Sequence, residues 1–199
     1  YCLYRGTGDV RFMLLPYDLD SVLTSSDPNT SIWLAGRLDR LRVIERFLTH
    51  PEFVPRYYAQ LKDVAETVFA PERFNPLIEQ VLGGWVPDQR IEAIEDFVAA
   101  RRAYVLSVIP TSFTIGSDLG IEAGYPLTNI PYAYDSDLYG TADAIETRSV
   151  LVNGQLAEWW SREGQWSLGA IMLDLFPGIN RVTVEAFEGP DGTGRRLTQ

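Results

Sequence analysis

The spacing of hydrophobic positions divides the chain into a short β segment, a helical middle and a β-rich end. Apolar runs at residues 1–4 and 11–15 flank a glycine-containing connection at residues 6–9. Glycine suits the left-handed positions of a tight turn, so we expect a β-hairpin over residues 1–17. From Phe12 to Leu15 the second run is apolar at every position, which predicts a strand that is buried on both faces.

The middle of the chain shows helical spacing. One stripe recurs at three- and four-residue intervals, and its members are Phe53, Tyr57, Leu61, Val64 and Val68. This stripe predicts one face of a helix. Pro71 is expected to open a second, shorter helix that ends at Gly83-Gly84. Asp88 is expected to cap a long helix that stops before Pro110.

After Pro110 the sequence becomes rich in glycine, threonine and asparagine, and period-two patterns replace the helical ones. Four strand candidates follow, at residues 146–152, 155–160, 165–173 and 181–187. Asn153-Gly154 joins the first two and is a strong hairpin signal, since both residues tolerate positive φ. Short strands with regular turns predict a β-sandwich.

The expected fold class is therefore α+β. Residues 1–112 would form a β-hairpin followed by a mostly helical part, and residues 113–199 would form an all-β sandwich. The sequence ends at Gln199 where another strand would be expected, so we expect this sandwich to be incomplete. The absence of an initiator methionine at Tyr1 indicates a fragment of a longer protein.

Composition narrows the classes of function. The 199 residues carry a net charge of −10, which disfavours binding to nucleic acid and to anionic membranes. No apolar run approaches the length that spans a bilayer, so we expect no membrane insertion.

A single histidine and a single cysteine exclude many catalytic arrangements. A helical zinc site with two histidines is impossible, and any catalytic triad would have to use His50. His50 precedes Pro51 at a helix start, where a solvated or capping role is expected. Cys2 lies in a strand and is expected to be a small core residue.

The remaining chemistry lies where the second apolar strand ends. Asp18 and Asp20 follow it, separated by one residue. Hard cations such as Mg²⁺ are bound by one or two carboxylates together with phosphate and water oxygens. A strand end can hold such ligands firmly, yet the same Asp-x-Asp spacing also occurs as turn or capping chemistry. Both interpretations stay open on spacing alone.

The residues around this pair resemble the spore-coat CotH kinase family. Residues 1–5 and 12–20 are similar to that family's strand, turn and "FxFLPWDLD" segment, with Tyr17 in place of the usual tryptophan. Residues 50–58, 69–75 and 97–102 are similar to its "NPEYRxRYL", "xFTPERLN" and arginine-pair helices. The resemblance covers about residues 1–108.

This resemblance implies the C-lobe of an atypical protein kinase that uses Mg²⁺ (or Mn²⁺) and ATP to phosphorylate Ser/Thr residues of a protein substrate. Asp18 would be the catalytic metal ligand and Asp20 a second or outer ligand; no further nucleotide-binding residue is assigned. The N-lobe lysine and the catalytic-loop aspartate would lie upstream, so the 199-residue chain alone is expected to be inactive. The family implies a secreted, cell-surface or spore-surface location.

The end of the chain resembles bacterial immunoglobulin-like modules at residues 140–143, 152–154 and 177–184, which implies an accessory role. Trp159, Trp160 and Trp166 are expected to fill the sandwich core rather than form a carbohydrate-binding face. Two alternatives to a kinase remain. One is a structural or adhesive surface protein without catalysis. The other is a carbohydrate-binding or carbohydrate-cleaving protein, and cleavage is disfavoured because its two carboxylates must face each other across the substrate.

Overall fold

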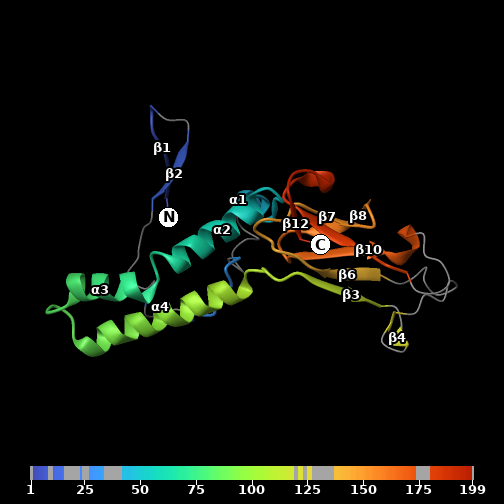
Figure 1. The fold of residues 1–199 in the computed structure, drawn as a ribbon. Helices are drawn as coiled ribbons and strands as arrows, with labels where there is room; N and C mark the ends of the chain where they lie inside the picture. The colour runs from blue at the N-terminus through green and yellow to red at the C-terminus, as the bar shows by residue number, and fades with distance from the viewer. Residues whose placement is uncertain are drawn as a thin grey trace. The chain divides into compact units, whose positions relative to one another are not determined.

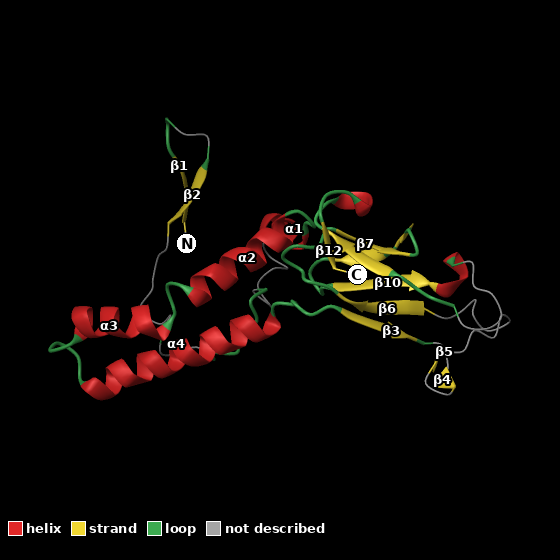
Figure 2. Ribbon diagram, viewed as in Figure 1, coloured by secondary structure: helices red, strands yellow, loops and turns green. Residues whose placement is uncertain are grey.

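The computed structural model combines helices with antiparallel sheets, so the α+β class is confirmed (Figures 1 and 2). The described residues are 2–8, 11–15, 23, 27–33, 42–118, 121–122, 125–126, 137–173 and 180–198. Two compact units are formed. One comprises Tyr1–Leu34 and Val64–Leu106, and the other comprises Ala35–Asp63 and Ser107–Gln199. The division into domains at residue 112 stays a prediction.

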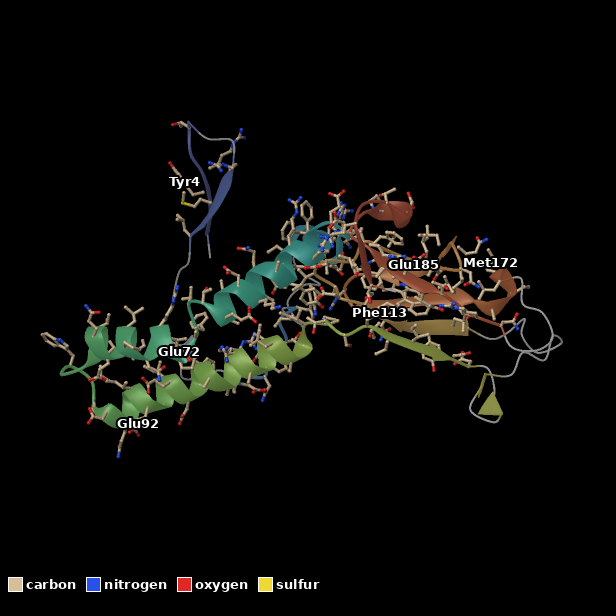
Figure 3. The ribbon with its side chains drawn as sticks, in the orientation of Figure 1. Tyr4, Glu72, Glu92, Phe113, Met172 and Glu185 are labelled. Atoms are coloured by element: carbon tan, nitrogen blue, oxygen red, sulfur yellow. The ribbon has the colours of Figure 1, made fainter. Side chains whose placement is uncertain are left out.

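The expected N-terminal hairpin is present. Strand β1 (Cys2–Arg5) pairs antiparallel with β2 (Phe12–Leu15), and Tyr4 lies opposite Met13. The expectation that the second strand is buried on both faces is wrong, because Met13 is 60% and Leu15 40% exposed. These two residues share one face of the hairpin with Tyr4, which is also exposed (Figure 3). A two-stranded ribbon buries a face only where another layer covers it.

Four helices follow: α1 (Arg42–Thr49), α2 (Phe53–Glu66), α3 (Pro71–Leu82) and α4 (Asp88–Val108). The predicted helical middle is therefore confirmed. The buried side of α2 carries Val54, Tyr58 and Ala65, whereas Val64 and Val68 of the predicted stripe are exposed. The buried face is thus rotated about one residue from the stripe that the spacing suggested.

Local signals set the ends of α3, and regular spacing sets the buried side of α4. Pro71 is the first residue of α3, and Gly83 caps its end by donating its N–H to the Glu79 carbonyl. Helix α4 buries Ile91, Val98 and Val105, which recur every seven residues and so lie on one side. No helix in the described part of the chain is both long and apolar enough to cross a membrane.

The β-rich end contains two four-stranded antiparallel sheets. The first has the order β3 (Thr114–Ser117), β6 (Asp137–Thr141), β10 (Gln165–Gly169), β9 (Glu158–Trp160). The second has the order β12 (Arg196–Thr198), β11 (Val184–Phe187), β7 (Ser149–Val152), β8 (Gln155–Leu156). A small separate ribbon pairs β4 (Ile121–Glu122) with β5 (Tyr125–Pro126).

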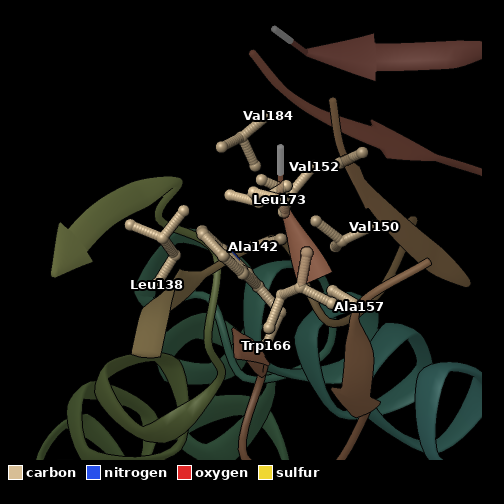
Figure 4. Close-up of a cluster of buried hydrophobic side chains, with 10 residues drawn as sticks. Leu138, Ala142, Val150, Val152, Ala157, Trp166, Leu173 and Val184 are labelled. Carbon is tan, nitrogen blue, oxygen red and sulfur yellow. The ribbon is translucent and has the colours of Figure 1, made fainter. Parts of the chain in front are cut away.

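Side chains from both sheets form one hydrophobic core (Figure 4). Trp166 of β10 is its largest member and is only 1% exposed. It lies directly opposite Gly140 of β6 and Trp159 of β9. A Cβ atom added at Gly140 would lie 2.9 Å from Cζ2 of Trp166, so the absence of a side chain there makes room for the indole.

One predicted strand belongs to both sheets. Residues 155–160 split into β8 and β9 at the buried Ala157, and the two halves pair with different sheets. The turn before β8 has the predicted chemistry, because Asn153 and Gly154 both adopt positive φ, 49° and 81°. The Asn153 side chain also accepts a hydrogen bond from the Thr183 N–H at 2.8 Å, which ties the turn to the segment before β11.

Tyr58 fixes α2 within the unit that contains the sandwich. Its side chain is buried, and its hydroxyl donates to the Arg162 carbonyl at 2.5 Å. Burial, followed by the nearby Glu163 carboxylate, raises the pKa of this hydroxyl above its ordinary value. The fold therefore favours the protonated phenol.

Replacing Gly140 with alanine should destabilise the sandwich. The new Cβ would lie 2.8 Å from the Thr114 carbonyl carbon and 2.9 Å from the Trp166 ring, and the backbone atom cannot move aside cheaply. We expect a loss of about 1–3 kcal/mol in the free energy of unfolding, measured by urea denaturation. Gly169→Ala in the same sheet is the matched control, since its Cβ would meet only ordinary contacts at 3.6 and 3.7 Å. Equal stability of the two variants would contradict this account.

Tyr58→Phe should reduce stability in a pH-dependent way. At pH 8 the loss should be about 1–2 kcal/mol, because the Arg162 carbonyl loses its donor. The raised pKa of Tyr58 adds stability that is complete below the unfolded pKa of about 10 and is lost as pH rises toward the folded value. The gap between wild type and variant should therefore narrow above pH 10, by up to about 1.4 kcal/mol per pH unit. Tyr139→Phe, at an exposed tyrosine, is the control; a gap that stays constant between pH 8 and 11 would refute the assignment.

Candidate functional site

The two predicted metal ligands, Asp18 and Asp20, lie outside the described residues. What the structure describes is the strand that leads to them. Strand β2 ends at Leu15 after four paired positions, from Arg5↔Phe12 to Cys2↔Leu15. Asp18 therefore follows the end of a hydrogen-bonded strand by three residues.

The loop beyond these aspartates is held by an arginine of α4. The Arg101 guanidinium donates through Nη1 to the Pro28 carbonyl at 2.9 Å and also to the Thr30 carbonyl. Its Cζ atom lies 5.3 Å from the centre of the Tyr104 ring, within cation–π range. One charged group thus satisfies two loop carbonyls and fixes the loop to the helix.

The neighbouring Arg102 also donates a hydrogen bond to a backbone carbonyl. Its Nε donates to the Ala65 carbonyl at 2.9 Å. Ala65 belongs to the last turn of α2, where carbonyls have no partner within the helix. The arginine pair that the sequence singled out therefore connects α4 to the loop at residues 27–30 and to the end of α2.

The single histidine has the capping role that was expected. Its Nδ1 atom accepts a hydrogen bond from the Glu52 N–H at 3.3 Å, and its ring packs on Phe53 with 5.0 Å between centroids. The His50 carbonyl accepts from the Phe53 and Val54 amides at the start of α2. Within the described ranges, no group of three or more His, Cys, Asp or Glu side chains is arranged to hold a metal ion.

The three tryptophans of the sandwich do not share one role. Trp166 lies in the core and Trp159 packs against it, as expected. Trp160 is the exception, because it is 44% exposed. Successive residues of a strand point to opposite faces, so burying Trp159 directs Trp160 to the outer face of the same sheet. The expectation that all three fill the core is wrong for Trp160.

A shallow hollow of about 500 Å³ lies on that outer face. Its lining residues are Thr114, Ile115, Gly116, Tyr139, Gly140, Thr141, Trp160, Gln165, Trp166 and Ser167. Its outward-facing residues belong to two rows of paired residues that run across the strands. The first row is Thr114, Thr141, Gln165 and Trp160, and the second is Gly116, Tyr139, Ser167 and, at its end, the exposed Glu158.

The polar groups of the hollow fall into two sets. Thr141 is already engaged, since its hydroxyl donates to the Ser112 carbonyl at 2.8 Å and lies 2.9 Å from the Thr114 hydroxyl. For the side chains of Gln165 and Ser167, by contrast, no hydrogen-bond partner is found among the residues with described positions. The amide and the hydroxyl are therefore available to a ligand.

Electrostatically the hollow differs from the rest of the chain. None of its lining residues is charged, although the chain carries a net charge of −10. The perturbed side chains lie elsewhere and have structural causes. Burial, followed by the nearby Arg56, lowers the pKa of Arg148, whose guanidinium donates to the Ile145 and Thr147 carbonyls. A hydrogen bond from Arg195 lowers the pKa of the exposed Glu188 carboxyl.

Sequence reasoning had picked out Trp160 but missed Tyr139, the second aromatic residue of the hollow. In the structure, buried and exposed positions alternate along residues 137–141. Leu138 and Gly140 face the core, so Tyr139 must face outward. The segment was not among the strand candidates, because its glycine weakens the hydrophobic alternation that predicts a strand.

Comparison with known proteins identified no relative: no family model, no curated protein and no solved structure matches this chain. The function therefore has to follow from two features of the chain itself. One is the pair of aspartates beyond β2, and the other is the uncharged hollow on the outer face of the β3–β6–β10–β9 sheet.

Proposed function

We propose that this chain is the metal-binding C-lobe part of a CotH-type protein kinase, followed by an accessory β-sandwich. The observation that carries the proposal is the β1–β2 hairpin, whose second strand ends at Leu15, just before the Pro-Tyr-Asp-Leu-Asp segment. In protein kinases a metal-binding aspartate is a required part of the phosphate site. Asp18 is the residue proposed for that role, and Asp20 is proposed as a second or outer ligand.

The compact unit of Tyr1–Leu34 and Val64–Leu106, called the helical unit below, supports this assignment through residues that carry the family resemblance. Helix α3 begins at Pro71, inside the segment that is similar to the family's "TPER" motif. The pair Arg101-Arg102 makes part-buried hydrogen bonds to carbonyls of the same unit. These residues thus have structural roles that a folded C-lobe would need.

The donor set suits the proposed ion. Two carboxylates offer hard oxygen ligands, which Mg²⁺ and Mn²⁺ prefer, and phosphate oxygens of ATP would complete the coordination. The bound ion would neutralise charge on the transferring phosphoryl group. The chain's own contribution would be to hold the carboxylates. The segment before them is paired in the β1–β2 hairpin, and the loop at residues 27–30 that follows them in sequence is bound by Arg101.

The proposal extends to partners. A complete kinase also needs a lysine that binds the phosphates and an aspartate that orients the acceptor hydroxyl. We infer that these come from a segment upstream of Tyr1, and that the acceptors are Ser/Thr residues of a protein substrate. The alternative, a structural or adhesive surface protein, is favoured by the net charge of −10 and by the well-packed sandwich.

Asp18→Asn should weaken metal binding. We expect the 199-residue chain to bind Mn²⁺, followed by the loss of its free-ion EPR signal, and the variant to bind about tenfold more weakly or worse, since even outer-sphere partners are worth about 10–100-fold. Asp96→Asn, at an exposed position of α4, removes the same charge elsewhere and should bind as the wild type does. Equal Mn²⁺ affinity of all three proteins would refute the metal site.

Phosphoryl transfer should require more than this chain. Incubated with Mg²⁺, labelled ATP and a serine-rich acceptor, the 199-residue chain should give no turnover above a blank. In a longer protein that supplies the N-lobe, Asp18→Asn should lower the rate by about a thousandfold, because a metal ion contributes several kcal/mol to the transition state. Asp96→Asn is again the control. Unchanged activity of the Asp18 variant would favour the structural alternative.

A further inference from the structure

We propose that the outer face of the β3–β6–β10–β9 sheet binds a neutral oligosaccharide, in the hollow between Tyr139 and Trp160. This inference does not depend on the kinase assignment, because it uses none of the same residues. Both aromatic side chains are 44% exposed, although each follows a core residue in sequence. The sheet therefore presents large apolar rings to solvent on the face that does not build its core.

The spacing of the two rings suits a ligand of several linked sugar units. Tyr139 is on β6 and Trp160 is on β9, and β10 lies between these strands. Two strand spacings and an offset of two residues along the strands separate their backbones by roughly 12 Å. The hollow of about 500 Å³ lies between them and is floored by Gln165, Ser167 and Thr141. A ligand that reached both rings would pass over this polar floor.

The Tyr139 ring packs against the neighbouring strand. It lies over Gly116 of β3, since a Cβ atom added at Gly116 would be 2.8 Å from Cε2 of the ring. Cross-strand pairing sets Gly116 directly opposite Tyr139. Because glycine leaves this place free, the ring can lie along the sheet instead of standing up from it, and a flat ring offers a stacking surface.

The chemistry of the hollow matches that of a neutral sugar. A pyranose has an apolar face of C–H groups, which packs on aromatic rings, and hydroxyls around its edge. The Gln165 amide can both donate and accept, as can the Ser167 hydroxyl, and neither has a partner among the described residues. Pockets for small ligands commonly combine aromatic walls with a few polar groups that fix orientation.

Charge excludes the main competing ligands. The lining carries no charged side chain, and Asp137 and Glu158 lie exposed on the strands that flank it. With a net charge of −10 on the chain, a nucleic acid, a phosphate or an acidic polysaccharide would be repelled. The hollow also offers no carboxylate that could hold a cation at its centre. An uncharged polyhydroxylated chain is the ligand class that remains.

The test is a titration of the 199-residue chain with neutral hexasaccharides of β-1,4-linked glucose, N-acetylglucosamine or mannose, followed by calorimetry. We expect at least one to bind, and Trp160→Ala or Tyr139→Ala to weaken that binding by about 10–30-fold. Trp85→Ala is the matched control, because Trp85 is 89% exposed in the other compact unit and should be dispensable. Gly116→Ala, which displaces the Tyr139 ring without removing it, should also weaken binding.

A measurement on the unaltered chain keeps the test independent of how the variants fold. In two-dimensional NMR spectra, the bound hexasaccharide should shift the amides of the residues that line the hollow, and those of Trp85 and its neighbours should stay in place. Binding by none of the three sugars would overturn the proposal. So would unchanged affinity of Trp160→Ala, or binding of an acidic polysaccharide such as polygalacturonate in preference to the neutral sugars.

Discussion

The packing of Trp166 against Gly140 is the contact on which the sandwich and its outer face both depend. The indole fits between the sheets only opposite a residue without a side chain, which fixes the register of β10 against β6. A slip of one residue would exchange the faces of the whole strand. With the register fixed, Tyr139 and Ser167 have to face outward. The composition of the hollow is thus a direct consequence of how the core is filled.

The helical unit depends on a different kind of contact, the satisfaction of backbone carbonyls by arginine. Arg101 and Arg102 bind carbonyls of the loop at residues 27–30 and of the last turn of α2. In sequence the proposed metal ligands follow β2 and precede this loop, and both of these flanking segments are held by hydrogen bonds. A metal site needs such support, because ligands that are free to move lose affinity. The arginine pair would therefore act on the proposed site only through the backbone.

Helix ends and tight turns could be predicted from single residues, whereas the short strands and their pairing depended on tertiary packing. The proline and glycine limits of α3 and the Asn153-Gly154 turn were foreseen, because each depends on the φ preference of single residues. The short strands β3 and β6 were not foreseen as strands, since Gly116 and Gly140 dilute their hydrophobic pattern. Residues 155–160 were expected to be one strand, yet they change sheets at Ala157. The Asp18 and Asp20 assignments stay predictions, because those residues lie outside the described part of the chain.

The same reasoning explains why the sequence drew attention to Trp160 but could not show that its side chain faces outward. A tryptophan pair in a strand contains one inward and one outward residue, and only the cross-strand partners decide which is which. Trp159 lies opposite Trp166 and is drawn into the core, which leaves Trp160 outside. The indole borders a lining without charged side chains, and the acidic Glu158 lies two residues away on the same strand. An exposed indole keeps its apolar surface in water, and packing it against a ligand would remove that surface from water. A neutral partner with apolar faces would therefore account for both the exposed rings and the uncharged lining of the hollow.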